Sequence, residues 1–193
     1  ADKVHLMKMK NPQGEEIAVN GAGMKVGIID TGIDYTHAMM KGAGTEEAYK
    51  SIDVSKPNAA FPNQKVVGGI DLVGTAYNAA SANMKFRIPT PDENPLDEAG
   101  HGTHVAGTVA GIGDGLNTYD GVAPEAKLYA IKVFGAEGST GDAVVIAGLE
   151  YAADISAAGD PNQQLDIVNL SLGSGYGFPH ILYNEAIGNL SKG

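Results

Sequence analysis

The chain has 193 residues, of which 43% are apolar and 19% charged, and this composition is typical of one globular domain. Its formal net charge of −10 argues against a nucleic-acid partner, because such a partner needs a basic face. The sequence contains no cysteine, which excludes disulfides and thiolate chemistry, and it has no apolar run long enough for a membrane span. We therefore expect neither a nucleic-acid partner nor a membrane partner.

Short apolar segments and periodic segments alternate along the chain. The apolar segments predict strands at residues 24–30, 65–72, 126–134 and 166–172. The periodic segments predict helices at about 101–111, 140–158 and 179–190. Because strands that alternate with helices form βαβ units, the expected fold is α/β, a three-layer parallel sheet with helices on both faces.

The first predicted strand ends on a carboxylate, in the sequence Val-Gly-Ile-Ile-Asp-Thr-Gly at residues 26–32. Ligands of open α/β sheets bind at the carboxyl ends of the strands, where Asp30 is placed to orient an imidazole and stabilise its protonated form. Two other interpretations stay open. Asp30 forms a turn with neighbouring amides, or Asp-Thr-Gly belongs to an aspartic protease, whose mostly β fold the predicted helices oppose.

The sequence His-Gly-Thr-His-Val-Ala-Gly-Thr-Val-Ala-Gly at residues 101–111 predicts a helix with His101 at its N-terminus. Gly100 and Gly102 leave bare backbone beside this ring, so a substrate can approach it closely, and we predict that His101 is catalytic. His104 shares a helix face with it and is predicted to be a packed, hydrogen-bonded histidine. A metal pair is the alternative, although zinc-binding helices typically space their histidines four apart.

The loop after this helix, at residues 113–121, is rich in glycine and oxygen-bearing side chains. Asp114, Asn117 and Asp120 supply oxygen ligands at a density that suits a structural Ca²⁺ ion. A solvated turn is the alternative, since the same residue types favour turns without any metal.

The last predicted strand contains Asn-Leu-Ser-Leu-Gly at residues 169–173. Backbone groups at the end of a strand can pair with an extended peptide, so this segment is a candidate for substrate binding. An ordinary strand within the sheet is the alternative interpretation.

Four segments together resemble the subtilisin-like serine proteases, the subtilases. They are the Asp motif at 28–34, the His motif Gly-His-Gly-Thr-His-Val-Ala-Gly-Thr at 100–108, the stretch from Gly-Val-Ala-Pro to Leu-Tyr-Ala-Ile-Lys-Val at 121–133, and the segment 169–173. The order of Asp before His is also that of subtilisin. The resemblance covers about residues 20–190, so we expect residues 1–193 to be a partial subtilase catalytic domain.

The resemblance implies a role for each motif. Asp30 would orient His101, and His101 would be the general base of an Asp-His-Ser triad that hydrolyses peptide bonds without a cofactor. The residues implied to hold a polypeptide substrate in extended form are Gly138, Ser139, Ser171, Leu172 and Gly173. The family further implies a secreted, extracellular protein.

The sequence departs from the family pattern in three respects. The separation of 71 residues between Asp30 and His101 (101 − 30) exceeds that in the simplest bacterial members of the family. It therefore implies insertions, which we place near 41–64 and 73–99. Met39 stands where many members have an acidic calcium ligand. The Gly-Thr-Ser-Met-Ala segment that carries the nucleophile, and the Asn of the oxyanion hole, do not occur in these 193 residues. The chain alone is therefore expected to be inactive and the fold incomplete.

Three hypotheses for the function follow. The first is the N-terminal part of a serine endopeptidase of the subtilisin class, whose partner is the C-terminal half of the same domain. The second is a non-catalytic module that binds extended peptides on a subtilase-like sheet. The third is a calcium-binding structural domain. An unpaired sheet edge also predicts a dimer or a tightly held partner fragment.

Overall fold

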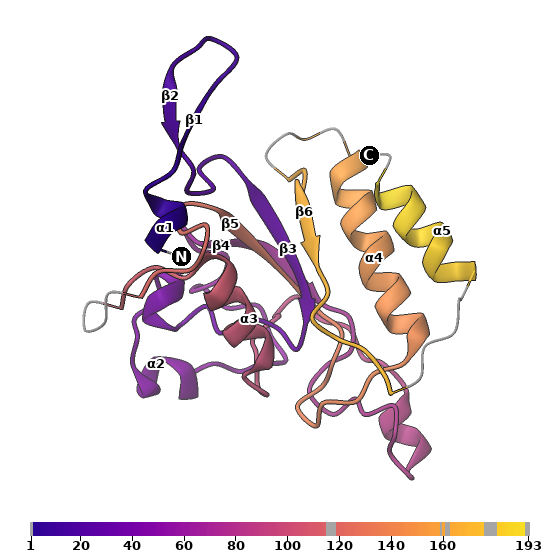
Figure 1. The fold of residues 1–193 in the computed structure, drawn as a ribbon. Coiled ribbons are helices and arrows are strands. Elements are labelled where there is room, and N and C mark those ends of the chain that lie inside the picture. Colours follow the sequence, from indigo (N-terminus) through magenta and orange to yellow (C-terminus); the bar gives the residue numbers. More distant parts are fainter. Residues whose placement is uncertain (1, 115–118, 159, 161–162, 176–180, 192–193) are drawn as a thin grey trace.

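A parallel sheet of four strands lies at the centre of the computed structural model, which describes residues 2–114, 119–158, 160, 163–175 and 181–191 (Figure 1). The strand order is β4-β5-β3-β6, formed by β3 (Lys25–Asp30), β4 (Val66–Asp71), β5 (Lys127–Lys132) and β6 (Ile167–Asn169). The three longer helices are α3 (His101–Ala110), α4 (Asp142–Ala157) and α5 (Ile181–Leu190). The α/β fold with a parallel sheet that the sequence predicts is confirmed.

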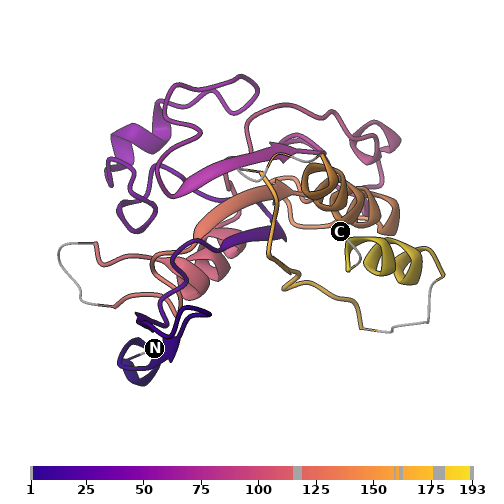
Figure 2. The same ribbon diagram turned by 90° about the horizontal axis from the view of Figure 1, so that it is seen from above.

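Helices cover both faces of the sheet, α3 on one face and α4 with α5 on the other (Figures 1 and 2). Successive side chains of a strand point to opposite faces, and β3 shows the consequence. Ile28 packs in the same buried cluster as Ala106 of α3. Ile29 packs in a second buried cluster with Leu149 of α4 and Ala186 of α5. The two faces therefore bury separate halves of the core.

The carboxyl ends of the two central strands lie side by side. β3 and β5 pair in register over six residues, and the last pair joins Asp30 to Lys132. Lys132 is fully buried, and its ammonium donates hydrogen bonds to the carbonyl oxygens of Thr31 (2.9 Å) and Phe134 (2.7 Å). Burying an ammonium costs free energy unless it donates hydrogen bonds. The hydrogen bonds of Lys132 therefore hold the chain in place where it leaves both strands.

The last strand is shorter than its sequence predicts. A strand was expected over 166–172, but β6 covers only Ile167–Asn169 and pairs with β3 alone among the described strands. The described ladder ends where Asn169 pairs with Ile28, so residues 170–172 lie beyond the strand. α5 begins at Ile181, and the expected start at 179 lies outside the described residues.

The two predicted insertions contain short helices that the sequence analysis did not expect. The 3-10 helix η1 (Ala38–Met40) precedes the first insertion, which holds α2 (Glu46–Lys50). The second insertion holds the 3-10 helix η2 (Met84–Arg87). The hydroxyl of Thr45 caps α2 by accepting a hydrogen bond from the amide of Ala48 at 3.2 Å. A helix of five residues is too short to show a hydrophobic period, and only its cap was readable.

The N-terminal segment lies outside the sheet and was not predicted. It contains α1 (Asp2–His5) and a hairpin of β1 (Lys8–Lys10) and β2 (Glu16–Ala18), which projects from the rest of the molecule in Figure 1. The His5 ring nitrogen Nε2 bonds the carbonyl oxygens of Gly121 (2.9 Å) and Val122 (3.2 Å). This contact ties the segment to the loop that precedes β5.

Candidate active site

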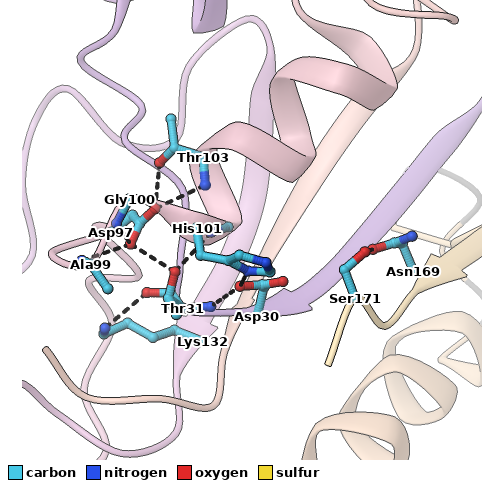
Figure 3. Close-up of polar contacts among 11 residues, drawn as sticks. Asp30, Thr31, Asp97, Ala99, Gly100, His101, Thr103, Lys132, Asn169 and Ser171 are labelled. Carbon is cyan, nitrogen blue, oxygen red and sulfur yellow. Dashed lines mark hydrogen bonds and ion pairs between the residues drawn. The ribbon is translucent and has the colours of Figure 1, made fainter. Parts of the chain in front are cut away.

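The site is built on one strand end and one helix start. Asp30 is the last residue of β3 and His101 the first residue of α3, and Asp30 Oδ1 lies 2.7 Å from His101 Nδ1 (Figure 3). The carboxylate side chain is 1% exposed, whereas the imidazole is 55% exposed. The pair therefore joins a shielded carboxylate to a ring that a reactant can reach.

The contact fixes the protonation pattern of the imidazole. An ionised carboxylate only accepts hydrogen bonds, so Nδ1 carries the hydrogen and the neutral ring keeps its lone pair on Nε2. The hydrogen bond to Asp30, and then its charge, raise the pKa of His101 above the usual value, while desolvation opposes the shift. Such a ring is a stronger base, and the carboxylate stabilises the imidazolium once it forms.

Two glycines allow the helix to start against the strand. Gly100 has φ 90°, a left-handed conformation that glycine adopts without strain. Gly102 packs so closely on the turn after β3 that a Cβ there would lie 2.2 Å from the carbonyl oxygen of Gly32. Bare backbone at Gly102 is thus needed to bring His101 within reach of Asp30.

The segments expected to bind substrate leave the sheet on either side of Asp30, because β5 and β6 flank β3. Gly138, with φ 68°, and Ser139 lie between β5 and α4, and the carbonyl of Ser139 accepts a hydrogen bond from Ala79 of the second insertion. Ser171 lies beyond β6, and Figure 3 shows it in the same view as Asp30. Its hydroxyl donates a hydrogen bond to Asn169 Oδ1 at 3.0 Å.

The prediction for His104 is wrong, because its side chain is exposed rather than packed. Buried positions on α3 recur every four residues, at Gly102, Ala106 and Ala110, and these small residues face the sheet. His104 lies off this stripe. Within the described part of the chain, no group of three or more His, Asp or Glu side chains is placed to hold a metal ion.

The predicted calcium loop is only partly described. Asn117 lies outside the described residues, Asp114 is half-buried, and Asp120 Oδ1 accepts a hydrogen bond from the amide of Gly113 at 2.7 Å. Met39 packs its methyl group against Gly111 at the end of α3. An apolar thioether therefore fills the position at which the resemblance implies an acidic ligand.

The polar residues that surround the pair were not predicted from the sequence. Asp97, Thr31 and Lys132 are all buried, and each forms hydrogen bonds beside the strand end or the helix start. The one local signal was the position of Asp97, a carboxylate shortly before a predicted helix, where it can accept the free amides of the first turn.

A parallel α/β sheet with a buried Asp at one strand end, bonded to a His at a helix start, is the arrangement that the resemblance to the subtilases implies. The sequence model of the Subtilase family matches residues 21–192, and the chain belongs to this family. Subtilisin DY of Bacillus licheniformis is 36% identical over 154 residues, which are 79% of this chain and 38% of that protein. The minor extracellular protease Vpr of Bacillus subtilis (strain 168) is 36% identical over 165 residues, 85% of this chain and 16% of Vpr.

A solved structure agrees with the family. The S41 psychrophilic protease superposes with a TM-score of 0.61 at 26% identity, over 90% of this chain and 43% of that one. The chain thus spans less than half the length of each of these proteins. Among the described residues, none of the helices has the length and apolar character that a membrane crossing requires.

Proposed function

We propose that this chain supplies the Asp and His of a serine endopeptidase of the subtilisin class. The observation that supports it best is the 2.7 Å contact between Asp30 at the end of β3 and an accessible His101 at the start of α3. Asp30 orients the imidazole, and His101 acts as general base and then as general acid. Membership of the subtilase family supports the same reaction class.

The proposed reaction needs a serine from a part of the protein outside these 193 residues. Nε2 of His101 takes the proton of that hydroxyl while the serine oxygen attacks the peptide carbonyl. The imidazolium then gives the proton to the leaving amine, and the acyl-enzyme forms. Water, deprotonated by the same ring, hydrolyses the ester. Amide donors for the oxyanion belong to that same outside part, so we expect the chain alone to be inactive.

The substrate we propose is a polypeptide held in extended form between two backbone segments. Gly138 and Ser139 form one side, and Ser171, Leu172 and Gly173 form the other. Exposed backbone amides and carbonyls bind a strand independently of its side chains, so this binding mode suits an endopeptidase. We also propose an extracellular location, which is supported by the similarity to the minor extracellular protease Vpr.

The test adds the serine-bearing C-terminal half and measures peptide hydrolysis. We expect His101→Ala to lower kcat by about 10⁴-fold or more, because no base remains for the serine. His104→Ala is the matched control on the same helix, since its side chain is exposed and three residues away, and its activity should stay within about twofold. Undiminished hydrolysis in His101→Ala would contradict the proposal.

Two further proposals concern binding rather than chemistry. The segment after β6, in which Ser171 and Gly173 are exposed, favours as second candidate a non-catalytic module for extended peptides. That module predicts peptide binding without any reactive serine in the complete gene product. Structural Ca²⁺ at Asp114, Asn117 and Asp120 stays a prediction, and calorimetric titration with Ca²⁺ that shows no uptake would remove it.

A further inference from the structure

One buried carboxylate outside the pair gathers five hydrogen bonds at the start of α3. Asp97 is 3% exposed. Its Oδ1 accepts from the hydroxyl of Thr31 (2.8 Å) and from the amides of Ala99 (3.0 Å) and Gly100 (2.8 Å). Its Oδ2 accepts from the amide (2.8 Å) and the hydroxyl (2.6 Å) of Thr103. Figure 3 shows these contacts beside His101.

Thr31 connects this carboxylate to the strand that carries Asp30. Its hydroxyl donates to Asp97 and accepts from the amide of Gly102 at 2.8 Å. Its own amide donates to Asp30 Oδ1 at 2.7 Å, and its carbonyl accepts from the buried ammonium of Lys132. Thr31 is therefore held at its amide, carbonyl and hydroxyl, and it can shift little relative to either element.

These bonds bracket both members of the pair. Thr31 follows Asp30 directly, while Gly100 and Gly102 flank His101, and all three are bonded to one small polar cluster. The first-turn amides of a helix have no partner within the helix, so a carboxylate that accepts them fixes where the helix begins. A helix start fixed in this way also fixes the position of its first residue.

We infer that Asp97 is a positioning residue of the candidate active site: through Thr31 and the first turn of α3 it sets the distance and angle between Asp30 and His101. Asp97 touches neither reacting atom. Its consequence for peptide hydrolysis rests on the function proposed above, whereas the geometric coupling does not. Residues that orient a reacting group in this way typically change rates by about 10–100-fold.

The direct test follows the His101 ring by NMR in the 193-residue chain. Thr31→Val removes the hydroxyl with no change of charge, and Thr31→Ser keeps it. We expect the wild type to show a low-field Nδ1 proton and a His101 pKa above its usual value of about 6.5. Thr31→Val should lose the low-field proton and return the pKa toward that value, and Thr31→Ser should retain both. Unchanged signals in Thr31→Val would overturn the inference.

A second pair of variants separates geometry from charge and serves if Thr31→Val fails to fold. Asp97→Glu keeps the negative charge but moves it by one methylene, and Asp97→Asn removes the charge. If Asp97 acts by position, both variants lose the low-field proton. A wild-type signal in Asp97→Glu, together with a loss in Asp97→Asn, would show that charge alone matters and would overturn the inference.

Activity of the complete enzyme gives a third measurement. We expect Thr31→Val to lower kcat about 10–100-fold with KM within about twofold, because the reacting groups and not the peptide-binding backbone are displaced. Equal losses in Thr31→Val and Thr31→Ser would contradict the role of the hydroxyl. If the wild-type complete enzyme is inactive while the NMR differences stand, the proposed function fails and the positioning role holds.

Discussion

His101 and Asp30 form a pair in which burial is unequal. Desolvation of the carboxylate keeps water from competing for its hydrogen bond, while exposure of the ring leaves Nε2 free to exchange a proton with a reactant. The raised pKa of His101 follows from this arrangement, and it has a cost at low pH. A protonated imidazole cannot act as a base, so activity is expected to fall as pH falls through that pKa.

This gives a prediction for the pH profile of the complete enzyme. In Asp30→Asn the anionic partner is lost, so the pKa of His101 falls and the acid limb of kcat/KM moves to lower pH. The plateau rate should fall by about 10⁴-fold, because an amide favours the wrong tautomer. Steady-state kinetics from pH 5 to pH 9 measure both. An acid limb at the same pH in both proteins would contradict the assignment of His101.

A second residue-scale prediction concerns Tyr35, which is fully buried and donates to Asn94 Oδ1 at 2.8 Å. Burial raises its pKa to about 12. The unfolded chain ionises Tyr35 near pH 10 and the folded chain does not, so folding loses stability as pH rises between these values. Between pH 10 and pH 12, the unfolding free energy of the wild type should fall by up to about 3 kcal/mol relative to that of Tyr35→Phe, at ~1.4 kcal/mol per pKa unit. Urea unfolding measures this difference. A constant difference would refute it.

At the scale of elements, the contact between α3 and β3 depends on small residues. Gly102→Ala places a methyl group against the carbonyl of Gly32, so we expect a loss of about 2–3 kcal/mol in unfolding free energy and displacement of His101. Gly107→Ala is the control, because the nearest atom to its Cβ would be Met40 Cε at 4.0 Å. It should be neutral or stabilise by up to about 1 kcal/mol. Equal losses in thermal unfolding would contradict this.

The elements also show what the sequence alone can predict. β3, β5 and α3 follow from apolar runs and from a glycine-flanked start, which are local signals, and the contact between Asp30 and His101 agrees with the expected arrangement. The positioning residue Asp97 was missed because its partner Thr31 lies 66 residues away, and only the folded chain brings the two together. The exposure of the His104 side chain was not predicted, because the buried residues of α3 are Ala and Gly, which differ little in hydrophobicity from their neighbours.

At the scale of the whole molecule, β6 leaves one edge of the sheet without a neighbouring strand in the described part of the chain. Ile167 on this edge is 52% exposed. Such an edge favours pairing with another chain, and the net charge of −10 opposes it at low ionic strength. We therefore predict that the isolated chain self-associates, and more strongly as salt is added.

Ile167→Lys tests this by adding a charge at the edge, and it should shift the chain toward the monomer in analytical ultracentrifugation. Ile88→Lys is the matched control, because Ile88 is 67% exposed and follows η2, outside the strands of the sheet. We expect its association to equal that of the wild type. Association that is reduced equally by both variants would show that the edge is not the contact.

The central claim is that these residues form the Asp-His part of a serine-protease site. In the most direct measurement, the complete gene product that contains Asp30 and His101 is labelled with a serine-directed phosphonate. We predict one labelled serine outside the 193 residues, with labelling lowered by about 10³-fold or more in His101→Ala, because the base activates that serine. No labelling of the wild type, or equal labelling of His101→Ala, would contradict the claim.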